Sequence, residues 1–215
     1  EPVQPVGDSR EEFMIRNHFY FRELSGGILL DQGIHMLDVC NWVLNEHPEN
    51  AVGNGNRTGG TNYGNTFSNY QAIYDYPAKR NVSIHSTQIG PTFNDVCARF
   101  IGTKGIAEAH YSRGVFIEGD NPWDSGVVKG EPSEKQRRSG AFTSALYDST
   151  SNKVKAFINS IESGLLINEA KSGAVSTLSA ILGRTSAIER ESTTWNEMNF
   201  SGQEFNPDLN LEQFG

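Results

Sequence analysis

The chain has 215 residues, and its 36% hydrophobic content is enough for one domain with a sizeable core but tight for two. Its formal net charge of −8 would repel a phosphate backbone, which argues against nucleic acid as a partner. Cys40 and Cys97 have neither redox-type nor metal-type spacing, so we expect two free, buried thiols.

The first residues indicate an extended segment. Pro2 and Pro5 bias their predecessors away from helix, and the chain begins at Glu1 without an initiator methionine. We therefore expect further chain to precede it. We assign residues 1–20 to a linker and interdomain segment and residues 21–215 to a single α+β domain.

Residues 28–44 predict a mostly buried helix, because the run is too long and too apolar for a typical strand. One face repeats at three-and-four spacing through Ile34, Leu37, Asn41 and Leu44. The opposite face carries the polar groups and consists of Asp31, His35, Asp38 and Trp42.

Short β-like runs follow His47 and Pro48. We expect strands at 51–53, 67–76, 82–88, 96–101, 106–109 and 115–117. Polar and apolar residues roughly alternate in the second and third runs, and the link at 77–81 suits a hairpin. The tight connection at 102–105 suggests that the later strands form an antiparallel meander.

The remaining third of the chain predicts a loop and two helices. Residues 119–140 have no periodicity and are expected to form a long surface loop, which includes a basic cluster at Lys135, Arg137 and Arg138 to which we assign no function. Residues 153–163 and 169–190 show helical periodicity and should cover a sheet face. Helices at both ends of a run of strands indicate an α+β fold.

No dinucleotide-binding motif follows any expected strand. Neither G-x-G-x-x-G nor a P-loop is present, and we interpret residues 53–56 and 59–60 as turns. The chain alone is therefore not expected to hold a dinucleotide. No apolar run approaches the ~20 residues that a membrane helix needs, so we expect a soluble, cytoplasmic protein, with export left open by the N-terminus.

Asp31 and His35 are the residues most suited to chemistry. Four residues apart on a helix, they project from the same face, and a carboxylate near an imidazole can fix its tautomer and raise its basicity. The same spacing also occurs in surface pairs and caps. We expect no metal site, because His18, His47, His85 and His110 lack ligand spacing. A serine hydrolase is not indicated, since no G-x-S-x-G elbow is present.

The run from Phe21 to Asp38, FRELSGGILLDQGIHMLD, resembles the G-G-x-x-x-D-x-G-x-H-x-x-D segment of the glucose-fructose oxidoreductase, inositol dehydrogenase and rhizopine-catabolism (Gfo/Idh/MocA) family. FIGTKG at 100–105 is similar to a turn of that family, as are segments at 176–184 and 194–198. The resemblance is to the C-terminal domain only, which implies an open, mainly antiparallel sheet with helices packed on one face and no Rossmann domain.

By this resemblance, His35 is the acid or base at the substrate hydroxyl, Asp31 orients substrate or His35, and Arg22 and Gln32 contact substrate. The family's cofactor, NAD or NADP, and its lysine in an E-K-P motif belong to a domain absent from this sequence, so the chain alone is expected to be inactive. The implied partners are a sugar or polyol substrate and further copies of the chain, joined through the open sheet face.

Three functions follow. The first is the substrate-binding and catalytic-base domain of an NAD(P)-dependent oxidoreductase acting on a sugar, inositol or related polyol. The second is a binding or oligomerisation module without catalysis, and the third is an NAD-dependent glycosidase-type relative. Residues 54–65 and 119–140, the loops that could select the substrate, carry no readable code.

Overall fold

A computed structural model describes residues 9–58, 63–88, 96–110, 114–125 and 144–212. The chain divides into two compact units, one formed by Glu1–Pro91 with Lys171–Gly215 and the other by Thr92–Ala170. The extended segment expected at residues 1–7 and the basic cluster at 135–138 lie outside the described residues.

The first unit begins with three short helices: α1 (Arg10–Arg16), the 3-10 turn η1 (His18–Tyr20) and α2 (Arg22–Ser25). The Ser9 hydroxyl caps α1 by accepting a hydrogen bond from the Glu12 backbone N–H at 3.3 Å. Residues within the expected linker are therefore helical. Helix α2 ends at Gly26, whose φ of 73° lies in the left-handed region that glycine adopts without strain.

The helix expected at 28–44 is confirmed. It comprises a π-helical turn, η2 (Leu29–Gly33), followed by α3 (Ile34–Leu44), and it ends at Asn45 in a left-handed conformation. Leu37 is fully buried and Asn41 nearly so, whereas Trp42 is 82% exposed. The two faces therefore divide as the three-and-four spacing predicts.

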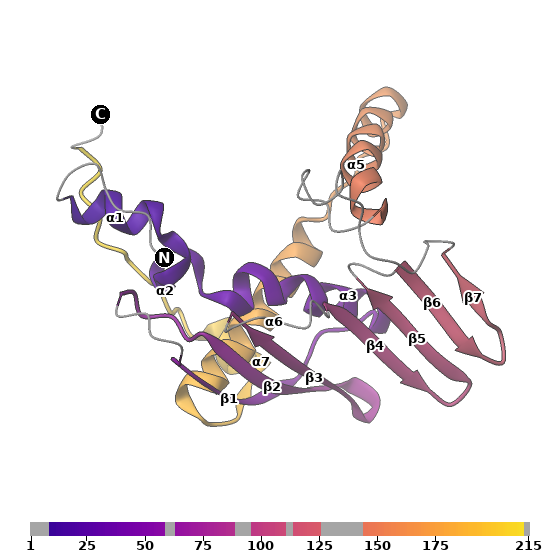
Figure 1. Ribbon diagram of the computed structural model, residues 1–215, viewed down its shortest axis with the longest axis horizontal. Coiled ribbons are helices and arrows are strands. Elements are labelled where there is room, and N and C mark those ends of the chain that lie inside the picture. Colours follow the sequence, from indigo (N-terminus) through magenta and orange to yellow (C-terminus); the bar gives the residue numbers. More distant parts are fainter. Residues whose placement is uncertain (1–8, 59–62, 89–95, 111–113, 126–143, 213–215) are drawn as a thin grey trace. The chain divides into compact units, whose positions relative to one another are not determined.

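The first sheet contains β1 (Asn50–Asn56), β2 (Asn69–Tyr76), β3 (Arg80–Thr87) and β8 (Thr193–Thr194), in the antiparallel order β3-β2-β1-β8. Figure 1 labels the first three of these strands. The predicted hairpin at 77–81 is confirmed as the link between β2 and β3, through the 3-10 turn η3 (Pro77–Lys79). The turn expected at 53–56 is wrong, because these residues belong to β1 and pair with β2. A Cβ on Gly53 would lie 3.1 Å from the Cβ of Ala187, so the absence of a side chain at Gly53 lets the helix that carries Ala187 pack close to β1.

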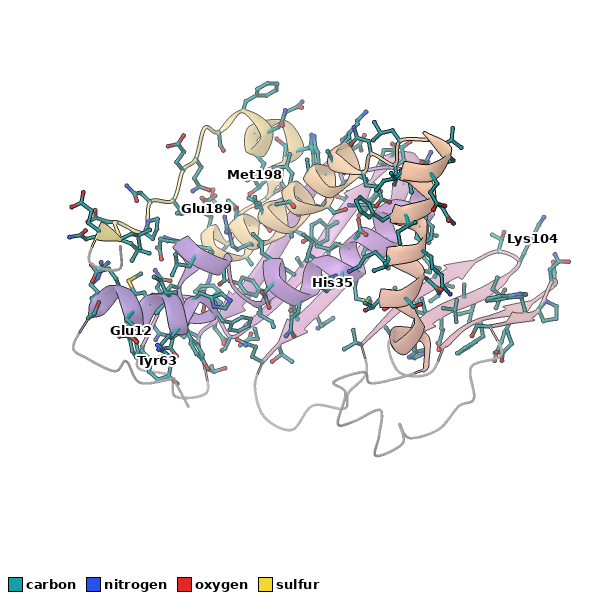
Figure 2. The ribbon with its side chains drawn as sticks, turned by 90° about the horizontal axis from the view of Figure 1, so that it is seen from above. Glu12, His35, Tyr63, Lys104, Glu189 and Met198 are labelled. Atoms are coloured by element: carbon teal, nitrogen blue, oxygen red, sulfur yellow. The ribbon has the colours of Figure 1, made fainter. Side chains whose placement is uncertain are left out.

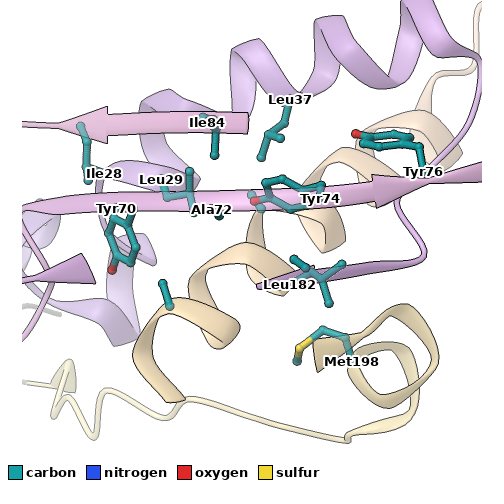
Figure 3. Close-up of a cluster of buried hydrophobic side chains, with 13 residues drawn as sticks. Ile28, Leu29, Leu37, Tyr70, Ala72, Tyr74, Tyr76, Ile84, Leu182 and Met198 are labelled. Atoms are coloured by element: carbon teal, nitrogen blue, oxygen red, sulfur yellow. The ribbon is translucent and has the colours of Figure 1, made fainter. Parts of the chain in front are cut away.

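Helix α6 (Ala170–Glu189) covers the inner face of this sheet, and the short α7 (Trp195–Phe200) follows β8. The side chains that give α6 its periodicity are buried or partly buried: Val175, Leu178, Ile181, Leu182, Thr185 and Ile188. Small residues beside them are buried as well: Ser176, Ser179, Ala180, Gly183, Ser186 and Ala187. Gly183 lies against the Tyr74 ring, and the tyrosines of β2 share the core with Leu182 (Figure 3). Large aromatic rings leave room only for small residues opposite them.

The second unit contains the predicted meander, β4 (Cys97–Gly102), β5 (Gly105–His110), β6 (Gly114–Gly119) and β7 (Trp123–Asp124), paired in chain order. It also contains α5 (Ser144–Ser163), which begins nine residues before the helix expected at 153–163. The prediction that this helix covers a sheet face with its apolar side is wrong, because that side is exposed. Four side chains of that face are 46–66% exposed: Val154, Phe157, Ile158 and Ile161.

Both cysteines are free, as expected, but only Cys40 is buried and Cys97 is partly exposed. Within the described ranges, no helix combines the length and apolarity that a membrane crossing requires. The observed architecture of two antiparallel sheets with several helices confirms the α+β class.

Candidate active site

Asp31 and His35 lie on the exposed side of one continuous helix, Asp31 in η2 and His35 in the first turn of α3. Figure 2 labels His35 on this helix. The opposite side of this helix is anchored in the core by Leu29 and Leu37, both fully buried. The buried side anchors the helix, so that its opposite side presents Asp31 and His35 to solvent. Gln32 is exposed on the neighbouring position of the same helix.

The π-helical turn alters the backbone beneath Asp31. Hydrogen bonds from the N–H groups of Leu30 and Asp31 both reach the Gly27 carbonyl at 3.0 Å, and the wider turn follows. Single π-turns within α-helices are frequent at functional sites. Gly33 faces the sheet: an added Cβ would lie 2.8 Å from Leu29 Cδ1 and 3.3 Å from Ser86 Oγ. The absence of a side chain at Gly33 therefore lets strand β3 pack close to the helix.

Hydrogen bonds to α6 fix the rotation of α3. The Ser176 hydroxyl donates to Asp38 Oδ1 at 2.6 Å, and the Asn41 amide donates to Ser179 Oγ at 3.1 Å. The Tyr76 hydroxyl donates to Asn41 Oδ1 at 2.7 Å. Because these partners are buried or partly buried, rotation of α3 would leave polar groups unsatisfied. The network therefore holds the exposed face that carries His35 in one orientation.

Arg22 lies in α2, before the glycine pair. Its guanidinium is 3.6 Å from a Glu23 carboxylate oxygen and 4.6 Å from the centre of the Phe205 ring. Its Nε is buried, and no described residue accepts a hydrogen bond from it. Burial acts to raise the pKa of Glu23, but hydrogen bonds from the Asn65 amide and the charge of Arg22 lower it below its ordinary value. This carboxylate is therefore held in its ionised form.

A cluster in the second unit was not apparent from sequence spacing. Ligand-type atoms of Cys97, Glu108 and His110 lie within 4.8 Å of one another. His110 Nε2 is 2.7 Å from Glu108 Oε2 and 3.5 Å from Cys97 Sγ, and Glu108 also pairs with Arg99. Cross-strand pairing of β4 with β5 places Cys97 opposite His110 and Arg99 opposite Glu108, which brings the cluster together.

Residues 6–108 match the family model described as the GFO/IDH/MocA C-terminal domain. No curated protein sequence matches the chain. Many solved structures resemble it, among them an oxidoreductase from Agrobacterium radiobacter in complex with NAD+, L-tartaric acid and magnesium. That structure has a TM-score of 0.62 and 15% identity, over 86% of this chain and 54% of the other.

Two further similar structures are dehydrogenases or oxidoreductases. The putative oxidoreductase from Thermotoga maritima has a TM-score of 0.58 and 19% identity, over 88% of this chain and 51% of that one. Scyllo-inositol dehydrogenase from Lactobacillus casei, with bound NAD(H) and scyllo-inositol, has a TM-score of 0.55 and 19% identity, over 84% and 52%.

The chain spans about half the length of each of these proteins. At such identities the structural likeness establishes the fold, and the family model adds the sequence relationship over residues 6–108. Residues 6–108, just under half of the chain, therefore carry the C-terminal domain of the Gfo/Idh/MocA oxidoreductase family.

Proposed function

We propose that this chain forms the substrate side of an NAD(P)-dependent dehydrogenase that oxidises a hydroxyl of a sugar, inositol or related polyol. The observation that carries the proposal is the exposed Asp31 and His35 pair, presented by a helix whose other face is locked into the core. Similar proteins are a scyllo-inositol and a myo-inositol dehydrogenase, which supports this substrate class.

In this proposal His35 removes the hydroxyl proton. Oxidation of a secondary alcohol requires this proton to leave as hydride departs from the same carbon, and an imidazole titrates in the range suited to a general base near neutral pH. Asp31, one helical turn earlier, orients the imidazole or the substrate. Arg22 and Gln32 supply donors for substrate oxygens.

The nicotinamide, when bound, supplies the hydride acceptor. The sequence has no G-x-G-x-x-G motif or P-loop, and the described strands pair antiparallel rather than in a parallel βαβ unit. In this proposal the cofactor is held mainly by a domain outside this chain. The chain's own residues bind the substrate, orient it and accept its proton.

The test uses the polypeptide that joins this chain to its nucleotide-binding domain, with sugars and inositols as substrates. His35→Ala and His35→Gln should lower kcat by about 100- to 10,000-fold, the usual contribution of a general base. NAD affinity should stay unchanged, since His35 does not hold the dinucleotide. NADH absorbance gives the turnover, and fluorescence titration gives the affinity.

His85→Ala is the matched control, because His85 is an exposed histidine on β3 of the same unit. It should retain full turnover. Wild-type turnover in both His35 variants would overturn the assignment of the base. Release of sugar from an aryl glycoside without net NADH would instead favour a glycosidase.

A further inference from the structure

A second arginine lies close to Arg22 and is unusually buried. Arg184 projects from α6 with 3% of its surface exposed, and its guanidinium carbon lies 5.0 Å from the centre of the Phe205 ring. Arg22 contacts the same ring at 4.6 Å. Two guanidinium groups therefore share one phenyl ring, contributed by the segment that follows α7.

One hydrogen-bond donor of this cluster has no acceptor. Arg22 Nε is buried, and no described residue accepts a hydrogen bond from it. A guanidinium that stacks through its face keeps the N–H groups at its edge available. Such donors, once removed from water, cost free energy until an acceptor meets them.

The charge of the cluster is also unbalanced. Arg22 and Arg184 carry two positive charges, and Glu23 is the carboxylate that acts on both, which leaves a net charge of about +1. Burial, together with the charge of Arg22, lowers the pKa of Arg184, although Tyr70 and Glu23 oppose this. A buried cation is stable when an anion pairs with it.

A cavity meets the cluster at Glu23. Its volume is about 550 Å³, and its lining combines polar side chains, among them Glu23, Asn65, Asn206 and Asp208, with apolar ones such as Phe13, Met14 and Phe21. Glu23 belongs to both the cluster and the cavity, and Asn206 follows Phe205 in the chain. These amide and carboxylate groups suit the hydroxyls of a small polyhydroxylated molecule. The side chain of Arg22, which is one-third exposed, leaves the cluster open to solvent.

We propose that Arg22 and Arg184, stacked on Phe205, bind the carboxylate of a small sugar acid whose hydroxylated body occupies the adjoining cavity. A carboxylate carries one negative charge and matches the net charge of the cluster, whereas a phosphate monoester carries about 1.5 to 2. Its two oxygens can accept hydrogen bonds from both guanidinium edges. Arg22 is also a substrate contact in the proposed function, so this inference rests on that function and narrows its substrate to a sugar acid.

The test titrates the 215-residue chain by isothermal calorimetry with D-gluconate and D-glucitol, which have the same six-carbon chain and differ by the carboxylate. D-gluconate should bind at least about tenfold more tightly, since charge-assisted hydrogen bonds distinguish the two. Glucitol 6-phosphate is the third probe. Equal affinity for gluconate and glucitol would overturn the proposal, and tighter binding of the phosphate would overturn the choice of carboxylate.

Two variants locate the binding site. Arg22→Gln and Arg184→Lys should each lower gluconate affinity about tenfold or more without changing that for glucitol, because the first removes a charge and the second removes the planar fork. Arg190→Gln, an exposed arginine just after α6, is the control and should bind gluconate as the wild type does.

Circular dichroism confirms folding of each variant. Should Arg184→Lys fail to fold, Arg22→Gln alone decides the matter, and wild-type gluconate affinity in that variant overturns the site. The titration requires neither NAD nor turnover, so it is independent of the proposed dehydrogenase activity.

Discussion

Two neighbouring tyrosines of β2 differ in what their hydroxyl groups contribute. The Tyr76 hydroxyl donates to Asn41 Oδ1 at 2.7 Å, whereas the hydroxyl of fully buried Tyr74 has no hydrogen-bond partner among the described residues. Tyr76→Phe should lower the free energy of unfolding by about 1–2 kcal/mol, because it leaves the Asn41 carbonyl unsatisfied. Tyr74→Phe removes an unpaired polar group and should be neutral or stabilising.

Urea unfolding followed by circular dichroism measures both changes. Each variant is the control for the other, since both remove one hydroxyl from the same strand. Equal losses for the two variants would show that the network around Asn41 does not contribute to stability.

The buried thiol of Cys40 should make the free energy of unfolding depend on pH. Burial raises the pKa of this thiol from 9.0 to about 11, so the folded chain retains a proton that the unfolded chain releases. The stabilisation is fully present below pH 9 and is lost as the pH rises from about 9 to 11. The loss amounts to about 2–3 kcal/mol at its full extent.

Urea unfolding at pH 8, 9 and 10 checks this dependence. Cys40→Ala should flatten the decline of unfolding free energy with pH, whereas Cys97→Ala, at a partly exposed position, should leave the slope unchanged. An unaltered slope in Cys40→Ala would show that other groups cause the decline.

At the scale of elements, the packing of α6 against the first sheet depends on the small residues of the helix. A Cβ on Gly183 would lie 1.8 Å from the Tyr74 hydroxyl and 2.5 Å from Tyr74 Cζ, so the helix or the ring must move. Gly183→Ala should therefore lower the free energy of unfolding by about 1–3 kcal/mol, the usual cost of overpacking.

Gly173 offers the matched control on the same helix. A Cβ there would meet nothing within 4 Å, so Gly173→Ala should raise the free energy of unfolding by about 0.5–1 kcal/mol through helix propensity alone. Chemical denaturation compares the two alanine variants. A stabilising effect at both positions would contradict the close contact between α6 and β2.

At the scale of the whole molecule, the outer face of the first sheet is the surface on which the expected homo-oligomer would form. Val52 and Ile73 lie opposite each other on β1 and β2 and are 47% and 50% exposed. Association would cover these apolar side chains. Ile73→Lys should therefore shift the chain to a smaller species in sedimentation measurements, whereas Ser83→Lys at its neighbour on β3 should have a weaker effect because no apolar surface is lost. A wild-type monomer at all concentrations would contradict this prediction.

The local pattern of residues 28–44 determined one helix with a buried and an exposed side, because the three-and-four spacing follows from helix geometry alone. Alternation likewise predicted β2 and β3, whose burial alternates in the structure. The exposed pair of Asp31 and His35 was therefore visible from the sequence, while their chemical roles rest on the family resemblance and remain a proposal.

Only the tertiary structure decided that the small residues of α6 enter the core beside its apolar face, and why residues 53–56 extend as a strand beneath it. Both depend on the tyrosines of β2, which lie far from α6 in the sequence. The association of Arg22 with Arg184 and Phe205 has the same origin. Periodicity describes how one element divides into faces, but which side chains meet is set by packing between elements, for which sequence separation is no guide.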